Sequence, residues 1–551
     1  MPGRFRRVAH GRKSACADTH YDSRRCRKPP AAVIAAVFRG DPQRRFFAIE
    51  VTVSFATSRL HPLLSPLFAA VCIASGVAAS RAAASQAVAA PTVQLAECTL
   101  PELSRPARCG SLSVAENPAK PDGRRLSLNI VVVPARNGRA LPDPVVFLSG
   151  GPGQAATPSA AFLSTALAEV NEERDLLLVD QRGTGASAPL PCALVDASDP
   201  AANLREIFPL AAVKRCARAL SARADLSQYS LLRFADDLEA VRLALGYSSL
   251  NLFGFSYGTR AAQVYLRRYP ASSRTAYLGS MIPMDADTLL ELPAAAEAVL
   301  DHTFAACAAD AACRTAFPDL REEFAALLVR LDRGEVIVTV PGARQKVALS
   351  RGLVVERVRS LLYTTEGAAT VPWLLHEAHA GNWQPLVDQL LDVARAMDAQ
   401  ASLGLFFTIT CNEDVAFLRE ADIRARATTH RFGDLRVRSQ QAACRAWPRY
   451  RVPNGYRTAL RSDVPVLLVS GEFDPATPAA LATRAAAGFT QHAQLLLRGQ
   501  AHSGWSDCVA ARYRQFVRRG STENLDACPE TARPAFMIDA EETAVRAATA
   551  G

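Results

Sequence analysis

Gly254-Phe255-Ser256-Tyr257-Gly258 stands between two segments of different kind. The apolar run 249–253 before it has the length of a strand, and residues 259–269 after it carry apolar side chains at helical spacing until Pro270. A serine flanked in this way by glycines, between a strand and a helix, is typical of a sharp turn that strains the serine backbone and exposes its hydroxyl above the sheet. The context predicts that Ser256 is a nucleophile; a purely structural serine is the alternative.

A serine hydroxyl becomes a good nucleophile when a base takes its proton and a third group orients that base. Two expected strands near the C-terminus, 464–471 and 493–498, are each followed by a suitable side chain, Asp474 and His502. The order serine, acid, histidine fits this turn, and open α/β sheets place their sites at the carboxyl edge. We expect Asp474 and His502 to complete a triad with Ser256; a surface or capping role is the alternative for His502. Two rival acids lie nearby: Glu472 and Asp507.

The third requirement for acyl transfer is a pair of backbone N–H groups that bind an oxyanion. An apolar strand at 144–148 runs directly into Ser149-Gly150-Gly151-Pro152-Gly153-Gln154. Glycines let the main chain turn with unobstructed amides. We expect the amides of Gly151 and Tyr257 to form the oxyanion hole; an ordinary glycine turn is the alternative.

Five segments now resemble those of a known group, the α/β-hydrolase serine peptidases of the proline iminopeptidase and tripeptidyl aminopeptidase type. The segments lie within residues 95–530, and they are Gly150–Gly153, Asp180–Ser187, Gly254–Thr259, Gly471–Pro478 and Ala501–His502. Iminopeptidases usually carry histidine where this chain has Ser149. The resemblance therefore points toward the secreted tripeptidyl aminopeptidases and away from strict proline specificity.

The net charge of +10 comes from the N-terminus. Residues 1–90 hold 14 Lys/Arg and 4 Asp/Glu, while the remainder holds 49 of each sign. A neutral remainder gives no support to nucleic-acid binding, so we expect no nucleic-acid partner.

An apolar run at 62–79 follows Arg59 and His61 and leads into small residues. This shape predicts a signal peptide over 51–90, with a single membrane anchor as the alternative. We expect a secreted or periplasmic protein without stable membrane association. The arginine-rich segment 1–50 precedes the signal; a start codon assigned too far upstream explains it, and a disordered basic extension is the other interpretation.

The cysteine count supports export. Three of the 13 cysteines lie in the first 90 residues, and ten follow: Cys98, Cys109, Cys192, Cys216, Cys307, Cys313, Cys411, Cys444, Cys508 and Cys528. An even number behind an export signal indicates disulfides. Pairing neighbours in sequence would close five modest loops, although spacing alone does not fix the connectivity. No cysteine or histidine cluster has the spacing of metal ligands, and we expect neither a metal nor another cofactor.

Short apolar strands alternating with helices predict an α/β-hydrolase fold with a mainly parallel sheet and helices on both faces. The expected strands are 128–134, 145–148, 176–180, 250–253, 275–278 and two near Val466 and Leu495. From 285 to 456 the pattern changes to long helices, including 294–309, which Pro293 would begin, and 324–331. We interpret 285–456 as a helical cap between an N-terminal core part, 91–284, and a C-terminal core part, 457–551.

An aminopeptidase must bind a free ammonium group, for which carboxylates are the simplest partners. Glu413 and Asp414 follow Cys411, and the resembling family tends to carry acidic residues after a cysteine here. We expect these two acids to bind substrate; a solvated acidic turn or helix start is the alternative. Asp236, Asp237 and Arg242 form an expected structural charge cluster.

Together these patterns predict a secreted serine peptidase that removes short N-terminal pieces from peptides. The alternative enzyme is an esterase that uses the same triad on small or lipid esters. The third hypothesis is a binding protein with a hydrolase fold that has lost its catalytic activity.

Overall fold

A computed structural model of the chain describes residues 93–539, so the expectations for 1–50 and 51–90 concern residues outside that range. Nine strands form the main sheet, in the spatial order β1-β2-β3-β5-β4-β6-β7-β10-β11. Their bounds are β1 (Ala96–Cys98), β2 (Ala107–Ala115), β3 (Arg125–Val133), β4 (Val145–Leu148), β5 (Leu176–Val179), β6 (Leu250–Phe255), β7 (Ser273–Gly279), β10 (Val466–Gly471) and β11 (His492–Leu497).

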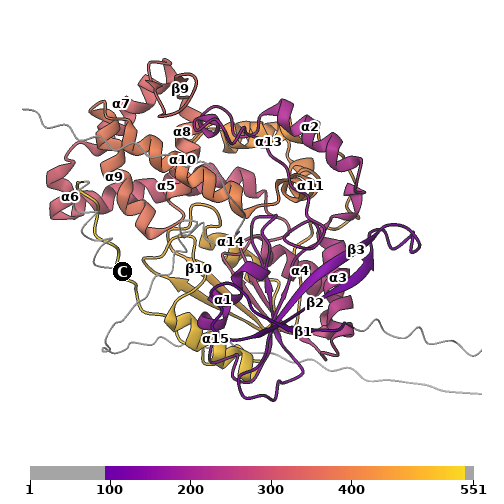
Figure 1. Cartoon of the computed structure of the whole chain (residues 1–551). Helices are drawn as coiled ribbons and strands as arrows, with labels where there is room; N and C mark the ends of the chain where they lie inside the picture. Colours follow the sequence, from indigo (N-terminus) through magenta and orange to yellow (C-terminus); the bar gives the residue numbers. More distant parts are fainter. Residues whose placement is uncertain (1–92, 540–551) are drawn as a thin grey trace, which may run out of the picture. The chain divides into compact units, whose positions relative to one another are not determined.

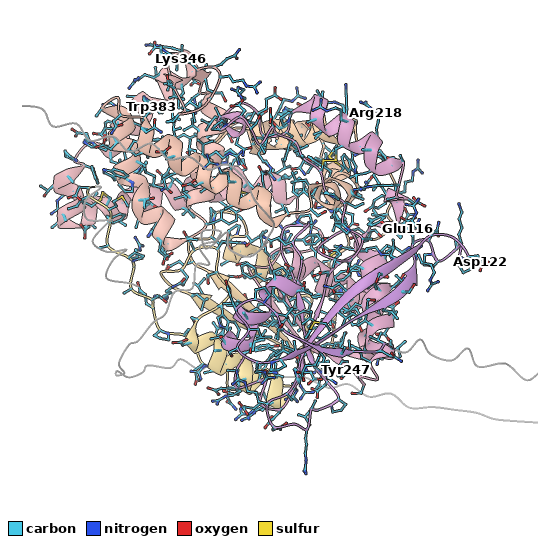
Figure 2. All side chains as sticks on the ribbon, viewed as in Figure 1. Glu116, Asp122, Arg218, Tyr247, Lys346 and Trp383 are labelled. Atoms are coloured by element: carbon cyan, nitrogen blue, oxygen red, sulfur yellow. A yellow bond between two sulfur atoms is a disulfide. The ribbon has the colours of Figure 1, made fainter. Side chains whose placement is uncertain are left out.

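The strands from β5 to β11 in this order pair in parallel, whereas β1, β2 and β3 form an antiparallel edge that joins β5. The predicted fold class, a mainly parallel sheet with helices on both faces and an inserted cap, is confirmed. All seven expected strands are present, but β1 and β2 were not expected. The β2–β3 hairpin carries Glu116 and Asp122 near its turn (Figure 2).

Each face of the sheet is covered by helices (Figure 1). On one face α1 (Ala160–Ala166) and α15 (Asp507–Arg519) bury apolar side chains against the strands. On the other face lie α3 (Leu231–Ala244), α4 (Gly258–Arg268) and α14 (Ala479–Ala486). Burial on both faces explains why the parallel strands read as continuous apolar runs.

Between β7 and β10 the chain forms a layer of helices, which we call the cap (Figure 1). The cap helices are α5 (Thr288–Ala309), α6 (Ala311–Ala316), α7 (Leu320–Asp332), α8 (Arg351–Leu361), α9 (Thr365–His379), α10 (Gln384–Gln400), α11 (Leu403–Glu413), α12 (Glu420–Arg426) and α13 (Leu435–Arg445). A short ribbon of β8 (Ile337–Val338) and β9 (Val347–Ala348), with Lys346 beside it, was not expected (Figure 2). Apolar side chains from α5, α7, α8, α9 and α10 form a separate core.

The helical layer also includes a segment from outside the expected cap boundaries. Helix α2 (Leu210–Ser221) packs against α11 and α13, although it precedes β6 in sequence (Figure 1). Short 3-10 helices complete the described elements: η1 (Thr157–Ser159), η2 (Ala202–Leu204), η3 (Leu226–Gln228), η4 (Pro270–Ser272) and η5 (Val415–Phe417).

The start expected for the first cap helix is wrong. Pro293 lies inside α5, which begins at Thr288, instead of at the helix start. Proline lacks the N–H that would bond the carbonyl four residues earlier, and this was the reason to place it at the first turn. The apolar side chains of Leu290 and Leu292 are buried, and their packing extends the helix across the proline.

The ten cysteines form five disulfides, so the predicted disulfide bonding is confirmed; each bond joins neighbours in sequence, a connectivity that spacing alone left open. The pairs are Cys98–Cys109, Cys192–Cys216, Cys307–Cys313, Cys411–Cys444 and Cys508–Cys528. Within residues 93–539, none of the helices has the length and apolar character needed to cross a membrane.

Candidate active site

The turn at Ser256 has the backbone strain that its sequence predicts. Ser256 has a φ of 53°, in the left-handed region that non-glycine residues rarely adopt. A Cβ at Gly258 would lie 1.9 Å from the carbonyl oxygen of Leu148, and one at Gly254 would lie 2.8 Å from the carbonyl oxygen of Gly258. Glycines are therefore required where β6, β4 and the start of α4 approach one another, and this packing holds Ser256 at the tip of the turn.

Asp474 and His502 meet at the same edge of the sheet. Nδ1 of His502 lies 2.7 Å from Oδ2 of Asp474, and both side chains are buried. Asp474 also accepts hydrogen bonds from the amides of Ala476 and Thr477 and from the Thr477 hydroxyl. The imidazole is therefore held by a carboxylate whose own orientation is fixed by the loop after β10.

The surroundings of Asp474 keep its carboxylate ionised. Burial by itself would raise the pKa, but the charge of His502, the hydrogen bond to it and those from Thr477 lower the pKa to about 2. An ionised Asp474 is the form that stabilises a protonated imidazole during proton transfer.

A ring contact, a close approach and a shared cavity bring the parts of the site together. The ring of Phe255, next to Ser256, lies 5.2 Å from the ring of His502, and a Cβ at Gly150 would lie 3.5 Å from the Ser256 Cβ. Ser256, Gly151, Tyr257 and Thr477 line one cavity. Within the described residues the Ser256 hydroxyl makes no hydrogen bond; catalytic serine–histidine bonds often tighten only once substrate is bound.

The glycine loop after β4 offers backbone donors to this cavity. Gly151 has a φ of 109°, which only glycine adopts easily. In the part of the chain that the structure describes, the amides of Gly151 and Tyr257 have no hydrogen-bond acceptor of their own. Both residues line the cavity that Ser256 also lines.

Asp180 holds the glycine loop in place. Its carboxylate is buried and accepts hydrogen bonds from the amides of Ala156 and Thr157, each at 2.9 Å, and from Asn129 and Ala186. Two residues further on, Arg182 makes two 2.6 Å hydrogen bonds to Asp237 on α3. The segment Asp180–Ser187 therefore supports the site from behind, and Asp237 has the structural role expected of it.

The cap contacts the glycine loop and the loop that carries His502. The amide of Ser402 donates to the carbonyl of Gly153 at 2.8 Å, and the amide of His502 donates to the carbonyl of Tyr363 at 3.0 Å. The Tyr363 ring packs edge-on against the His502 ring at 4.9 Å. Neither contact was visible in the sequence, because the residues are far apart along the chain.

The structure places Glu413 outside the residues that line the cavity. Its carboxylate accepts hydrogen bonds from the hydroxyls of Tyr450 and Tyr456 and from the amide of Leu231. Burial raises the pKa of Glu413 to about 7, and these three donors offset part of that rise. We therefore assign Glu413 a structural role in place of the substrate-binding role expected from sequence.

Asp414 lines the cavity but already has a partner. It ends α11, and its carboxylate pairs with the guanidinium of Arg260 on α4. The expected alternative, a solvated turn or helix start, is wrong for both acids, because they lie at a helix C-terminus and neither side chain is exposed.

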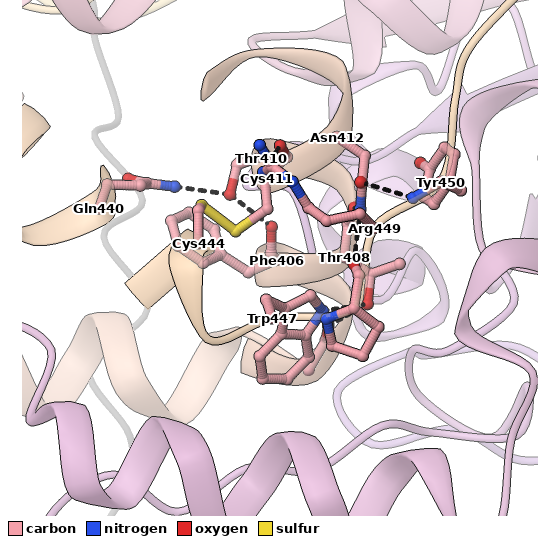
Figure 3. Close-up of a disulfide and its surroundings, with 12 residues drawn as sticks. Phe406, Thr408, Thr410, Cys411, Asn412, Gln440, Cys444, Trp447, Arg449 and Tyr450 are labelled. Carbon is pink, nitrogen blue, oxygen red and sulfur yellow. Dashed lines mark hydrogen bonds between the residues drawn. A yellow bond between two sulfur atoms is a disulfide. The ribbon is translucent and has the colours of Figure 1, made fainter. Parts of the chain in front are cut away.

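The disulfide Cys411–Cys444 holds the end of α11 against α13 (Figure 3). Around it, Gln440 donates to the Thr410 hydroxyl, Trp447 donates to the Thr408 hydroxyl, and Arg449 donates to the Cys411 carbonyl (Figure 3). Asp414 follows this braced helix end directly, so its position is well fixed.

Sequence reasoning missed several charged residues of the cavity. Asp398 from α10, Arg357 and Arg359 from α8, and Arg436 from α13 all line it. They lie on separate helices with no local motif, so only the packing of the cap brings them together.

Two family models match the chain. One described as alpha/beta hydrolase fold covers residues 143–347, and one described as TAP-like protein covers residues 429–528. The first includes the Ser256 turn, and the second includes Asp474 and His502.

Two of the curated relatives are named as peptidases. Serine protease Hip1 of Mycobacterium tuberculosis is 27% identical over 224 residues, which are 38% of this chain and 42% of that protein. The chain therefore matches less than half the length of this relative. Tripeptidyl aminopeptidase of Streptomyces coelicolor is 25% identical over 416 residues, 68% of this chain and 73% of that protein. Among solved structures, proline iminopeptidase of Mycobacterium smegmatis has 18% identity and a TM-score of 0.37, over 74% of this chain and 98% of that chain.

Proposed function

We propose that this chain, which belongs to the α/β-hydrolases and has serine peptidases among its relatives, is an exported aminopeptidase that releases short N-terminal pieces from peptides. Ser256 attacks the carbonyl carbon while His502 takes the hydroxyl proton, and Asp474 holds the imidazole. His502 then passes the proton to the leaving amine, and water hydrolyses the acyl-enzyme. The amides of Gly151 and Tyr257 stabilise the oxyanion in both steps.

One observation carries the triad: the buried Asp474–His502 hydrogen bond forms at the same sheet edge as the strained Ser256. A histidine held in this way has one nitrogen bound to the carboxylate and the other free for proton transfer. Phe255, the neighbour of Ser256, packs against that same imidazole.

The cavity favours a peptide over a small ester. Its lining includes charged side chains from the cap, among them Asp398 and Asp414, which suit a polar substrate with free ends. Residues 285–456 then serve as the cap that shapes the pocket and excludes water. Small or lipid esters remain the alternative substrates.

The disulfides support export. Five disulfides in one chain are typical of an oxidising compartment, since cytosolic thiols are kept reduced. We therefore propose a secreted or periplasmic protein, as the segment 51–90 also indicates.

A substrate panel with an active-site probe tests the proposal. Purified protein is given a fluorophosphonate probe, then free-amine peptides, the same peptides acetylated at the N-terminus, and short-chain esters. We expect labelling of Ser256 and the highest kcat/KM for free-amine peptides. Labelling together with cleavage of esters alone would favour the esterase, and no labelling and no cleavage would favour a binding protein.

A further inference from the structure

Three arginines form part of the cavity wall that the cap contributes. Arg357 and Arg359 lie on α8, and Arg436 lies on α13. Arginine stays protonated in proteins and offers five N–H donors in a fixed planar fork. The number of hydrogen-bond acceptors that the protein supplies to each guanidinium group decides whether that arginine is structural or available to a ligand.

Arg359 is satisfied within the protein. It makes two hydrogen bonds to the carboxylate of Glu356, at 2.6 and 3.0 Å, and one to the Tyr363 hydroxyl at 2.9 Å. Its role is to hold Glu356 and Tyr363 in position behind the cavity.

Arg357 and Arg436 have few partners. Arg357 donates one hydrogen bond, to the carbonyl of Asn203 at 3.4 Å, and Arg436 donates one to Glu356 at 3.3 Å. The Nε of each is buried and has no hydrogen-bond partner in the described chain. Arg357 is only 8% exposed and lines the cavity, so further acceptors for its N–H groups would have to come from the cavity side. Buried donors without acceptors are costly, and they often mark a place where a ligand supplies them.

The charges around these arginines do not balance. The three guanidinium groups face two carboxylates, Glu356 and Asp398, which leaves one positive charge in excess. Burial lowers the pKa of both Arg357 and Arg436, and Glu356 offsets only part of this effect. Within the described residues Asp398 forms no ion pair, and its own side chain is exposed.

The surroundings fix Arg436 in orientation. Its guanidinium lies over the ring of Phe208 at 5.2 Å and close to the ring of Phe406 at 5.8 Å, and both phenylalanines line the same cavity. A guanidinium packed against aromatic rings can keep its planar edge free for a planar anion, which lowers the entropy cost of binding.

We propose that Arg357 and Arg436 form a carboxylate-binding subsite of the cavity, so that preferred substrates carry a carboxylate beyond the bond that Ser256 attacks. This inference rests on the proposed function, because it takes the cavity beside Ser256 as the peptide site. The carboxylate is either the free C-terminus of a short peptide or the side chain of an aspartate or glutamate. Either group would supply two acceptor oxygens to guanidinium N–H groups that have no acceptor within the protein.

Paired peptides test the subsite on the wild-type enzyme. One pair differs only in a C-terminal carboxylate or carboxamide, and a second pair, amidated at the C-terminus, differs only in glutamate or glutamine within the sequence. We expect the carboxylate member of one pair to have about 10- to 100-fold higher kcat/KM, because charge-assisted hydrogen bonds are about twice as strong as neutral ones. The first pair identifies a C-terminus and the second an acidic side chain. Equal rates within both pairs would overturn the proposal.

Variants link the preference to these arginines. Arg357→Gln and Arg436→Gln should each reduce the carboxylate preference, measured as the ratio of kcat/KM for the carboxylate peptide to kcat/KM for the amidated peptide. Arg436→Lys should keep the charge and retain part of the preference. The matched control is Arg395→Gln on α10, an exposed arginine that pairs with Asp392; it should leave the preference intact. A preference that survives in both glutamine variants would overturn the assignment.

The same assays distinguish the carboxylate-subsite proposal from the proposed peptidase function on which it rests. Labelling of Ser256 and cleavage of amidated peptides without any carboxylate preference would overturn the subsite alone. Absence of labelling and of cleavage on every peptide would overturn the peptidase function and the subsite together. If a glutamine variant does not fold, the wild-type pairs and Arg436→Lys still decide.

Discussion

The carboxylate of Asp414 pairs with the guanidinium of Arg260, and this ion pair joins the end of cap helix α11 to α4, the helix that follows Ser256. Arg260 is further held by the carbonyls of Ala286 and Pro283. A substrate ammonium that binds Asp414 must therefore share the carboxylate with a cation fixed by other partners.

This arrangement makes Asp414 a testable determinant of amine recognition. If Asp414 binds the substrate ammonium, Asp414→Asn should reduce the preference for free-amine over acetylated peptides by about 10- to 100-fold, since the charge-assisted contact is lost. Hydrolysis of a small neutral ester should change little. Glu413→Gln is the matched control, because Glu413 lies outside the cavity lining and should leave the preference unchanged. A preference that persists in Asp414→Asn would remove this residue from amine recognition.

The triad residues should act as a unit. Ser256→Ala should abolish fluorophosphonate labelling and lower kcat by about 10⁴-fold or more. His502→Ala should lower kcat by nearly as much. Asp474→Asn should lower kcat as well, because the amide no longer stabilises the imidazolium. Circular dichroism checks that each variant is folded. Labelling of another serine, or substantial turnover by Ser256→Ala, contradicts the mechanism.

Glu413 should make stability depend on pH. Its pKa rises from the ordinary 4.5 to about 7 in the folded protein, so between these values the folded state holds a proton that the unfolded chain releases. This contribution is fully present below about pH 4.5 and is lost as the pH rises through 7. At 1.4 kcal/mol for each pKa unit, the loss is on the order of 3 kcal/mol.

Denaturant unfolding of wild type and Glu413→Gln from pH 4 to 8 measures this contribution as the difference between the two proteins. The free energy of unfolding of wild type relative to that of Glu413→Gln should fall as the pH rises from 4 to 8. The contributions of the other carboxylates are the same in both proteins and cancel. A constant difference would show that Glu413 titrates alike in both states.

The Cys411–Cys444 disulfide should contribute to both stability and specificity. It closes a 33-residue separation in the cap, and loops of this size correspond to roughly 3–4 kcal/mol of unfolded-state entropy. The double variant Cys411→Ala/Cys444→Ala should lower the denaturation midpoint and weaken the free-amine preference, since Asp414 follows the braced helix end. The double variant Cys98→Ala/Cys109→Ala, at the antiparallel edge of the sheet, is the control and should leave the preference intact.

Export can be checked by the mass of the protein from its native host. The intact mass should correspond to a start between about residues 79 and 92, with all ten cysteines of the remaining chain oxidised. Thiol labelling without reductant should be negligible. A cytoplasmic protein with residues 1–50 attached and its thiols reduced would contradict the export proposal.

Local chemistry explains which parts of the fold and site could be predicted. The turn at Ser256 and the loops bearing Asp474 and His502 are each set by a few consecutive residues, so their order along the chain was informative. The hydrogen bond between Asp474 and His502 follows from two adjacent parallel strands, β10 and β11, that end side by side.

Other features depend on packing between distant segments. The arginines on α8 and α13 meet only because the cap folds, and α2 joins the cap although its sequence resembles any amphipathic helix. Glu413 and Asp414 were expected from sequence to share the same role, and this was wrong because neighbours in sequence can point in different directions. The Glu413 side chain points toward two tyrosines, and the Asp414 side chain points toward Arg260. Likewise, buried neighbours extend α5 across Pro293 against its local preference.

The two hydrogen bonds from Ser402 to Gly153 and from His502 to Tyr363 tie both halves of the site to the cap. The sheet can therefore remain folded while the enzyme is already inactive, because loosening the cap releases the glycine loop and the histidine loop together. Heat inactivation should then precede global unfolding, and the half-life of activity should report the integrity of the cap rather than that of the sheet.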